Sequence, residues 1–245
     1  MMNLSLKGKT FIITGAGGAI ASAINTGFLE AGANLALADR PGNAERARER
    51  LGAGLAVPCD LSSLTGAQAM VQATLERYGR IDGLIHTVGG FAAGKVIETV
   101  FEVTVLEVTV LEVYERMFDL NVRTLVHAVV ASLPEIIKVE GGFIGGISAG
   151  QVARGAGGGA AYYTAAKAAV ALFLNSLGAE LSGSSTKVGV VYPMGAVDTP
   201  ANRKDMPKVD PNTWIDPFEI GAAFVHMATR SDRGRIRELQ VFASH

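Results

Sequence analysis

A tyrosine and a lysine four residues apart, Tyr163 and Lys167, are the pair in this sequence best suited to acid–base chemistry. No helix breaker separates them, so both side chains lie on one face of a predicted helix over 160–181. A phenol titrates near a pH of about 10, and a neighbouring ammonium favours the phenolate. Tyr163 is therefore predicted to exchange a proton with a substrate oxygen.

A glycine-rich turn follows the first predicted strand and opens a helix. Its small residues allow close approach to a pyrophosphate, and the helix N-terminus supplies N–H groups; the turn residues are Gly15, Gly17, Gly18, Ala19 and Ile20. The second strand ends at Asp39, whose carboxylate can bind both hydroxyls of an adenosine ribose and repels a 2′-phosphate. This pattern favours NAD, while the adjacent guanidinium of Arg40 keeps NADP open.

Together these features resemble the short-chain dehydrogenase/reductase family. That family has a serine at the end of a later strand and the tyrosine–lysine pair on the next helix, as Ser148 and the segment from Tyr163 to Lys167 are placed here. Asn121, in Phe118-Asp-Leu-Asn-Val, matches the family's helix asparagine. The resemblance implies a catalytic set of Asn121, Ser148, Tyr163 and Lys167, and reversible hydride transfer between a nicotinamide and a carbonyl or alcohol. Ser148 would bond the carbonyl oxygen, and Asn121 would hold a water that links Lys167 to solvent.

The resemblance implies further contacts with the cofactor. Each follows a predicted strand or forms part of the catalytic pair: Asp60, Leu61, Gly89, Tyr163, Lys167, Pro193, Val197 and Thr199. An N-cap role for the next helix explains Asp60 almost equally well.

Departures from the family pattern keep two other functions open. Ala19 and Ala21 replace the second and third glycines of the turn, and His86-Thr-Val-Gly89 keeps only the family's glycine, so a nucleotide-binding protein without turnover is one alternative. The segment 199–207 and Trp214 resemble the substrate side of dihydropteridine reductase, so pterin reduction is the other. Ser148 argues for ordinary carbonyl chemistry, because a quinonoid pterin needs no polarised carbonyl of that kind.

Seven short apolar runs must position these residues. They alternate with helix-length segments, and the runs are 10–14, 34–38, 54–58, 83–88, 142–147, 188–192 and 238–243. This alternation requires right-handed crossovers in a parallel sheet. We therefore predict an α/β, doubly wound, Rossmann-like fold with about seven strands and helices on both faces, and with its site at the carboxyl ends of the strands.

Composition limits the organisation and the partners. The 245 residues, 49% of them apolar, fit one domain over 1–245. A net charge of −1 without a basic cluster predicts no nucleic-acid or membrane partner. Cys59 is the only cysteine, so we expect no internal disulfide, no metal site and a reducing cytoplasm.

Two features concern assembly. A pentapeptide repeat, Glu102–Leu106 and Glu107–Leu111, predicts an insertion over 97–113, and its conformation stays open because its Val and Thr residues favour extended structure whereas its flank is helical. The apolar faces of 114–137 and 165–177 exceed what one sheet face needs. In the resembling family these helices pair across a two-fold axis, so a homodimer or homotetramer is expected.

Overall fold

The computed structural model of the chain describes residues 5–93, 96 and 107–244. For residues 107–111 it describes the backbone alone. One sheet of seven parallel strands runs through it, in the order β3-β2-β1-β4-β5-β6-β7. The strands are β1 (Thr10–Thr14), β2 (Asn34–Asp39), β3 (Leu55–Pro58), β4 (Gly83–His86), β5 (Phe143–Ile147), β6 (Lys187–Pro193) and β7 (Glu238–Val241). All seven predicted runs form strands, and the predicted fold class is confirmed. The strand order reverses between β1 and β4, which places the switch point there.

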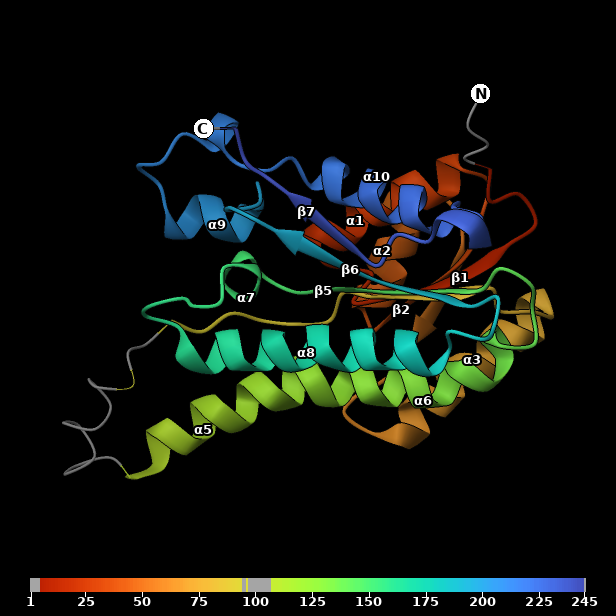
Figure 1. Cartoon of the computed structure of the whole chain (residues 1–245), viewed down its shortest axis with the longest axis horizontal. Coiled ribbons are helices and arrows are strands. Elements are labelled where there is room, and N and C mark those ends of the chain that lie inside the picture. The colour runs from red at the N-terminus through yellow and green to blue at the C-terminus, as the bar shows by residue number, and fades with distance from the viewer. Residues whose placement is uncertain (1–4, 94–95, 97–106, 245) are drawn as a thin grey trace.

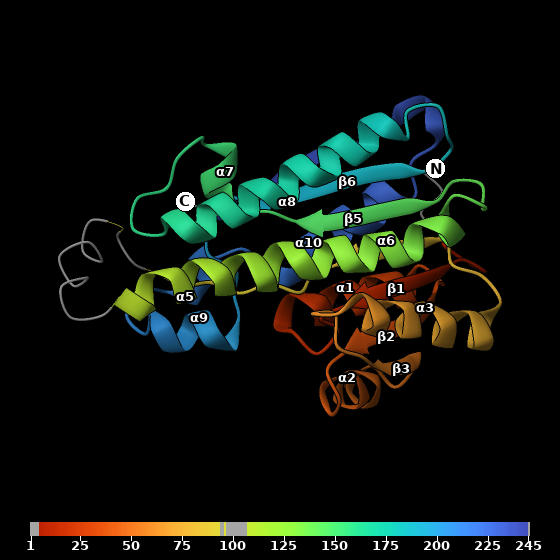
Figure 2. The same cartoon turned by 90° about the horizontal axis from the view of Figure 1, so that it is seen from below.

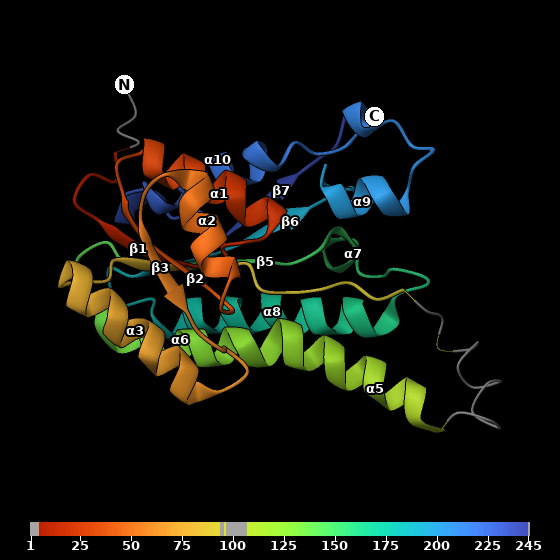
Figure 3. The same cartoon turned by 180° about the vertical axis from the view of Figure 1, so that it is seen from behind.

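Helices cover both faces of the sheet (Figures 1 and 2). One face carries α1 (Ala19–Glu30), α2 (Asn43–Leu51) and α10 (Pro217–Ala228). The other carries α3 (Leu64–Tyr78), α5 (Glu107–Phe118), α6 (Thr124–Ile136) and α8 (Ala161–Glu180). Figure 3 shows the same two layers from behind. Each face has its own apolar core, with Phe28 and Phe224 on the first side and Met70 and Leu174 on the second.

Two short helices, α7 (Gly150–Ala153) and α9 (Pro200–Asp205), lie at the end of the molecule where the strands have their carboxyl ends (Figure 1). The short 3-10 helices η2 (Pro211–Thr213) and η3 (Asp232–Gly234) flank α10 along the chain. None of the helices in the described part of the chain is long and apolar enough to cross a membrane.

The predicted insertion falls mostly on residues that the structure does not describe. The first pentad of the repeat, Glu102–Leu106, lies outside the described residues, whereas the second, Glu107–Leu111, forms the beginning of α5. In the second pentad the helical preference of the flanking segment therefore overrides the extended preference of Val and Thr.

Helices α5 and α6 are joined by a π-helical turn, η1 (Asp119–Arg123), instead of forming the single regular helix that the sequence pattern predicts. A π turn shifts the backbone bonds by one residue and leaves a carbonyl to be satisfied elsewhere. Asn121 is in this turn, and its side-chain Nδ2 donates to the carbonyl oxygen of Met117 at 2.9 Å. The predicted catalytic residue Asn121 therefore lies in the π-helical turn between α5 and α6.

Candidate active site

A cleft of about 1210 Å³ opens at the carboxyl ends of β1 to β4. Its walls are the glycine turn, the ends of β2 and β3, the loop after β4, one face of α5 and the start of α9. Most of the predicted cofactor contacts line it: Gly15, Gly17, Gly18, Ala19, Ile20, Asp39, Arg40, Asp60, Leu61, Gly89 and Thr199. The other predicted contacts, Tyr163, Lys167, Pro193 and Val197, do not line this cleft.

The glycine turn has the shape that a phosphate cradle needs. Gly15 has φ +65°, a left-handed conformation, and a Cβ there would lie 2.9 Å from Oγ1 of Thr87 and 3.0 Å from the backbone N of Val88. Gly18 is the N-cap of α1 and offers no side chain to the first free N–H groups of the helix. Those N–H groups and the helix dipole therefore face the cleft and fit the pyrophosphate of a dinucleotide.

The alanines that replace family glycines are accommodated. Ala21 is 1% exposed and lies within the apolar core between α1 and the sheet. Ala19 is the first residue of α1 and lines the cleft. The departure from the glycine pattern therefore leaves the turn and the packing of the helix intact.

The carboxylate of Asp39 is held at the floor of the cleft by three donors. Gly17 N donates to Oδ2 at 2.9 Å, while Arg40 N and Nδ2 of Asn43 donate to Oδ1 at 2.7 and 3.2 Å. Asn43 was not predicted, although its position four residues beyond Asp39, at the start of a helix, could have indicated it. The carboxylate is thereby fixed beside the phosphate turn, where a ribose would lie.

Asp60 stabilises a turn and does not cap the next helix. Its Oδ1 accepts from the backbone N of Ser62 at 2.9 Å, and Ser63 is the N-cap of α3. Hydrogen bonds from Ser62 lower the pKa of Asp60. The N-cap interpretation is thus wrong, and the ionised carboxylate stays exposed at the cleft.

The catalytic candidates form a second group next to the cleft. Ser148, directly after β5, is buried, and its Oγ donates to the backbone carbonyl of Lys167 at 2.9 Å. The Nζ of Lys167 donates to the carbonyl of Ile147 at 3.1 Å. To bond a substrate oxygen, the Ser148 hydroxyl must give up its present acceptor.

Burial shifts the pKa values of the tyrosine and the lysine. It raises the pKa of Tyr163 to about 12 and lowers the pKa of Lys167 to about 8. No hydrogen bond joins Lys167 to the phenol within the described residues, and in this structure the ammonium does not offset the burial of Tyr163. The expected lowering of the phenol pKa thus needs a further positive charge or a closer approach of Nζ.

Gly89 lines the cofactor cleft and also lies close to two of the catalytic candidates. A Cβ at Gly89 would lie 2.6 Å from Oδ1 of Asn121 and 3.0 Å from Nζ of Lys167. Asn121 also pairs with Gly90 on both sides of its amide: Gly90 N donates to Oδ1 at 3.3 Å, and Nδ2 donates to Gly90 O at 3.2 Å. The loop after β4 therefore lies against both Asn121 and Lys167, and it also lines the cofactor cleft.

His86 is structural. It is buried, with Nδ1 2.9 Å from Oγ1 of Thr14 and Nε2 3.2 Å from Oγ1 of Thr124, so both ring nitrogens have partners. Burial and the nearby charge of Lys167 lower its pKa to about 3. His86 therefore stays neutral and ties β4 to β1 and to α6.

The segment after β6 reaches the cleft only at its end. Thr199 lines the cleft and caps α9 by accepting from the backbone N of Asn202 at 3.2 Å. Val197 is buried in a bridge with Ile215, and Pro193 ends β6 opposite Val241. Of these three predicted contacts, the structure brings only Thr199 to the cleft.

Comparisons with known proteins agree with this arrangement. A family model described as short chain dehydrogenase matches residues 9–210. The chain belongs to this family and is therefore an NAD(P)-dependent oxidoreductase.

Individual relatives support the assignment, and a solved structure has the same fold. The chain is 31% identical to oxidoreductase UcpA of Salmonella typhimurium, over 90% of this chain and 88% of the relative. It is 30% identical to meso-2,3-butanediol dehydrogenase of Serratia marcescens, over 76% of this chain and 70% of the relative. The structure of 3-ketoacyl-(acyl-carrier-protein) reductase from Brucella melitensis complexed with NADH has a TM-score of 0.81 at 24% identity, covering 97% and 98% of the two chains.

Proposed function

We propose that the protein reversibly reduces a carbonyl to an alcohol, with Asn121, Ser148, Tyr163 and Lys167 as the catalytic set. One observation carries the proposal: Gly89 touches both the cofactor cleft and the space between Asn121 and Lys167. A panel of ketones and aldehydes, followed by the loss of reduced-nicotinamide absorbance, tests it. Binding of NADH without turnover of any member would favour the nucleotide-binding alternative.

In this mechanism the nicotinamide supplies or accepts the hydride. Tyr163 gives the substrate oxygen a proton in the reducing direction and takes it back in the oxidising direction. Ser148 turns its hydroxyl from the carbonyl of Lys167 to the same oxygen. Lys167 would supply a positive charge from the same helix once its Nζ approaches the phenol. Asn121 holds the loop after β4 through its two hydrogen bonds with Gly90.

NAD is the proposed cofactor because the cleft is negatively charged. Its charged lining comprises five carboxylates and two guanidinium groups: Asp39, Asp60, Glu112, Glu115, Asp119, Arg40 and Arg116. The three residues from α5 were not predicted, since the sequence does not indicate which helix face closes the cleft. A 2′-phosphate adds negative charge beside Asp39, which disfavours NADP.

Replacing Asp39 with Ala should lower the preference for NADH over NADPH, expressed as the ratio of kcat/KM values, by about tenfold. The substitution removes acceptors for the ribose hydroxyls and the repulsion of a 2′-phosphate, while Arg40 remains. Steady-state kinetics with both cofactors measure the ratio, and Glu219→Gln on the remote helix α10 serves as the control. An unchanged ratio would show that Asp39 does not contact the ribose.

Pterin reduction stays the alternative within the same class. Ser148 distinguishes the two reactions, because only a carbonyl needs its hydroxyl for polarisation. Turnover of a quinonoid dihydropterin that survives Ser148→Ala would support the alternative.

We also propose a single catalytic domain that acts on a small molecule in the cytoplasm as a homodimer or homotetramer. Helices α6 and α8 lie on the same face of the sheet (Figure 2). Val130 of α6 (51%), Ile137 just after it (50%) and Leu172 of α8 (69%) are exposed, which favours burial against a second copy. Light scattering should give a multiple of 25.5 kDa. A monomer mass at micromolar concentration would contradict this assembly.

A further inference from the structure

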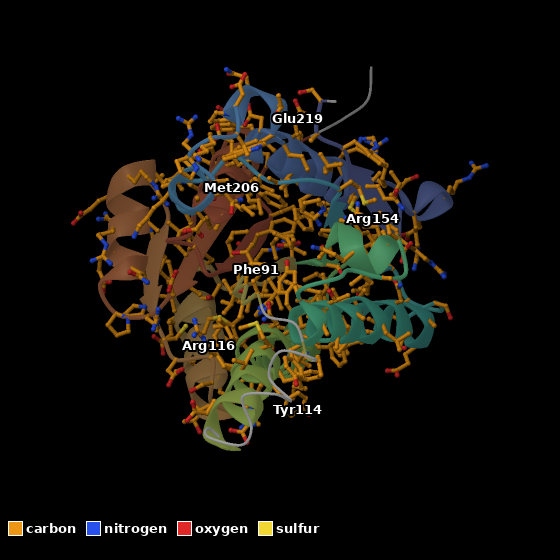
Figure 4. All side chains as sticks on the ribbon, turned by 90° about the vertical axis from the view of Figure 1, so that its left-hand side faces the viewer. Phe91, Tyr114, Arg116, Arg154, Met206 and Glu219 are labelled. Atoms are coloured by element: carbon orange, nitrogen blue, oxygen red, sulfur yellow. The ribbon has the colours of Figure 1, made fainter. Side chains whose placement is uncertain are left out.

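Phe91 is a large apolar side chain at the open end of the molecule, and 59% of its surface is exposed. Figure 4 looks onto that end and shows Phe91 near its centre, with Arg116 and Tyr114 of α5 on one side and Met206, just beyond α9, on the other. A single exposed phenylalanine is ordinary on a protein surface. Its surroundings must therefore show whether it has a role.

The ring of Phe91 contacts the ring of Tyr163. Their centroids are 5.0 Å apart and their planes are inclined at 78°, an edge-to-face arrangement. Phe91 thus lies directly beside the proposed proton donor while most of its own surface stays free.

The position of Phe91 is fixed by the two glycines before it. A Cβ at Gly90 would lie 2.5 Å from Cδ2 of Leu120, and Gly89 is closed in by Asn121 and Lys167. Asn121 also holds the backbone of Gly90 with two hydrogen bonds. A side chain at Gly89 or Gly90 would displace Asn121, Lys167 or Leu120, and Phe91 is the next residue of the loop after β4 that carries one.

We propose that Phe91 forms a wall of the substrate site beside Tyr163, and that the substrate carries a flat apolar group, such as a ring, next to its reacting carbon. This inference rests on the proposed carbonyl reduction and names its substrate class. A ring of the substrate would cover the exposed surface of Phe91 and stack on it or meet it edge to face. A small polar carbonyl compound would leave that surface in water.

The same wall shields the phenol from water. Burial raises the pKa of Tyr163 to about 12, and the ring of Phe91 contacts it. Removing Phe91 therefore has two separable consequences: loss of apolar contact with a substrate, and exposure of the phenol.

Kinetics with two ketones test the substrate class. Acetophenone carries a ring beside its carbonyl, whereas diacetyl is small and polar. Phe91→Ala should lower kcat/KM for acetophenone about tenfold and for diacetyl by about twofold or less, with Phe91→Leu in between. Phe218→Ala is the matched control, because Phe218 is 56% exposed and lies on α10. It should change neither value.

Two other kinetic results overturn the inference. An equal fall for both ketones would mean that Phe91 acts only on Tyr163, and no fall would mean that it contacts no substrate. If the wild type turns over neither ketone, the proposed carbonyl reduction fails on these substrates, and saturation-transfer NMR of the NADH complex still tests the wall. Ring protons of acetophenone should then receive saturation in the wild type and not in Phe91→Ala. Equal transfer in both proteins would contradict the proposal.

A pH profile separates contact with Tyr163 from a general effect on folding. With water admitted, the pKa of the phenol should fall towards about 10. In Phe91→Ala the rate of alcohol oxidation, which needs the phenolate, should therefore reach half its maximum at a lower pH than in the wild type. Phe218→Ala should leave the profile unchanged, and an unshifted profile in Phe91→Ala would show that Phe91 does not shield the phenol.

Discussion

Replacing Tyr163 with Phe should reduce kcat by about 10²- to 10⁴-fold, because the reaction then loses its general acid. The ring and its edge-to-face contact with Phe91 would be kept, so the fold and the substrate wall should be preserved. The phenol does not line the cofactor cleft, and the Kd for NADH should therefore stay within about threefold of the wild-type value. Steady-state kinetics and a fluorescence titration of NADH measure the two quantities.

The neighbouring tyrosine provides a matched control. Tyr162 is on the same helix, but Lys167 is not at the four-residue spacing from it, and its ring faces Tyr114 at a centroid distance of 6.3 Å. Tyr162→Phe should therefore leave kcat nearly unchanged. Full activity in Tyr163→Phe, or an equal loss in both variants, would exclude Tyr163 as the proton donor.

Replacing Gly15 with Ala should weaken NADH binding about a hundredfold, which corresponds to about 2.7 kcal/mol. The added methyl group would meet Oγ1 of Thr87 and the backbone of Val88 at 2.9 to 3.2 Å. Because Thr87 is itself held by the carbonyl of Thr14 at 2.7 Å, the turn must move away from the loop after β4. This displacement would carry the phosphate cradle out of register with Asp39.

A substitution at a second glycine distinguishes displacement of the turn from backbone strain alone. Gly141 has φ +73° and no atom within 4 Å of its Cβ position, so Gly141→Ala introduces the strain of a left-handed alanine without a clash. Gly141→Ala should lose about 1 kcal/mol of stability, and Gly15→Ala should lose more because of its clash. Only Gly15→Ala should lose affinity for NADH, as measured by calorimetry. Equal affinities in the two variants would contradict the assignment of the turn to the pyrophosphate.

The sequence predicts the parts of this protein that depend on local patterns. Short apolar runs become strands because a parallel sheet is buried on both faces, and β1 and β5 are buried at every position. Gly15, Asp39 and Asp60 reach one cleft because the carboxyl ends of parallel strands meet at the same edge.

Contacts that depend on packing could not be predicted in the same way. The wall formed by Glu112, Glu115 and Arg116 depends on how α5 lies over the cleft, and the π turn at Asn121 is not visible in a regular apolar repeat. The short helices α7 and α9 have too few residues for a periodic signal. The pKa of Tyr163 is raised because the phenol is buried, and burial cannot be deduced from the spacing of the tyrosine and the lysine.

The central claim is that hydride passes between a nicotinamide in the cleft and a carbonyl held beside Tyr163. Its most direct test uses NADH deuterated at C4 of the nicotinamide and a reducible ketone, with the product alcohol examined by NMR. Deuterium should appear on the carbinol carbon in the wild type, and labelling should be at least about a hundredfold slower in Tyr163→Phe. If the protein binds NADH to saturation but no product of the carbonyl panel contains deuterium, the proposed hydride transfer is contradicted.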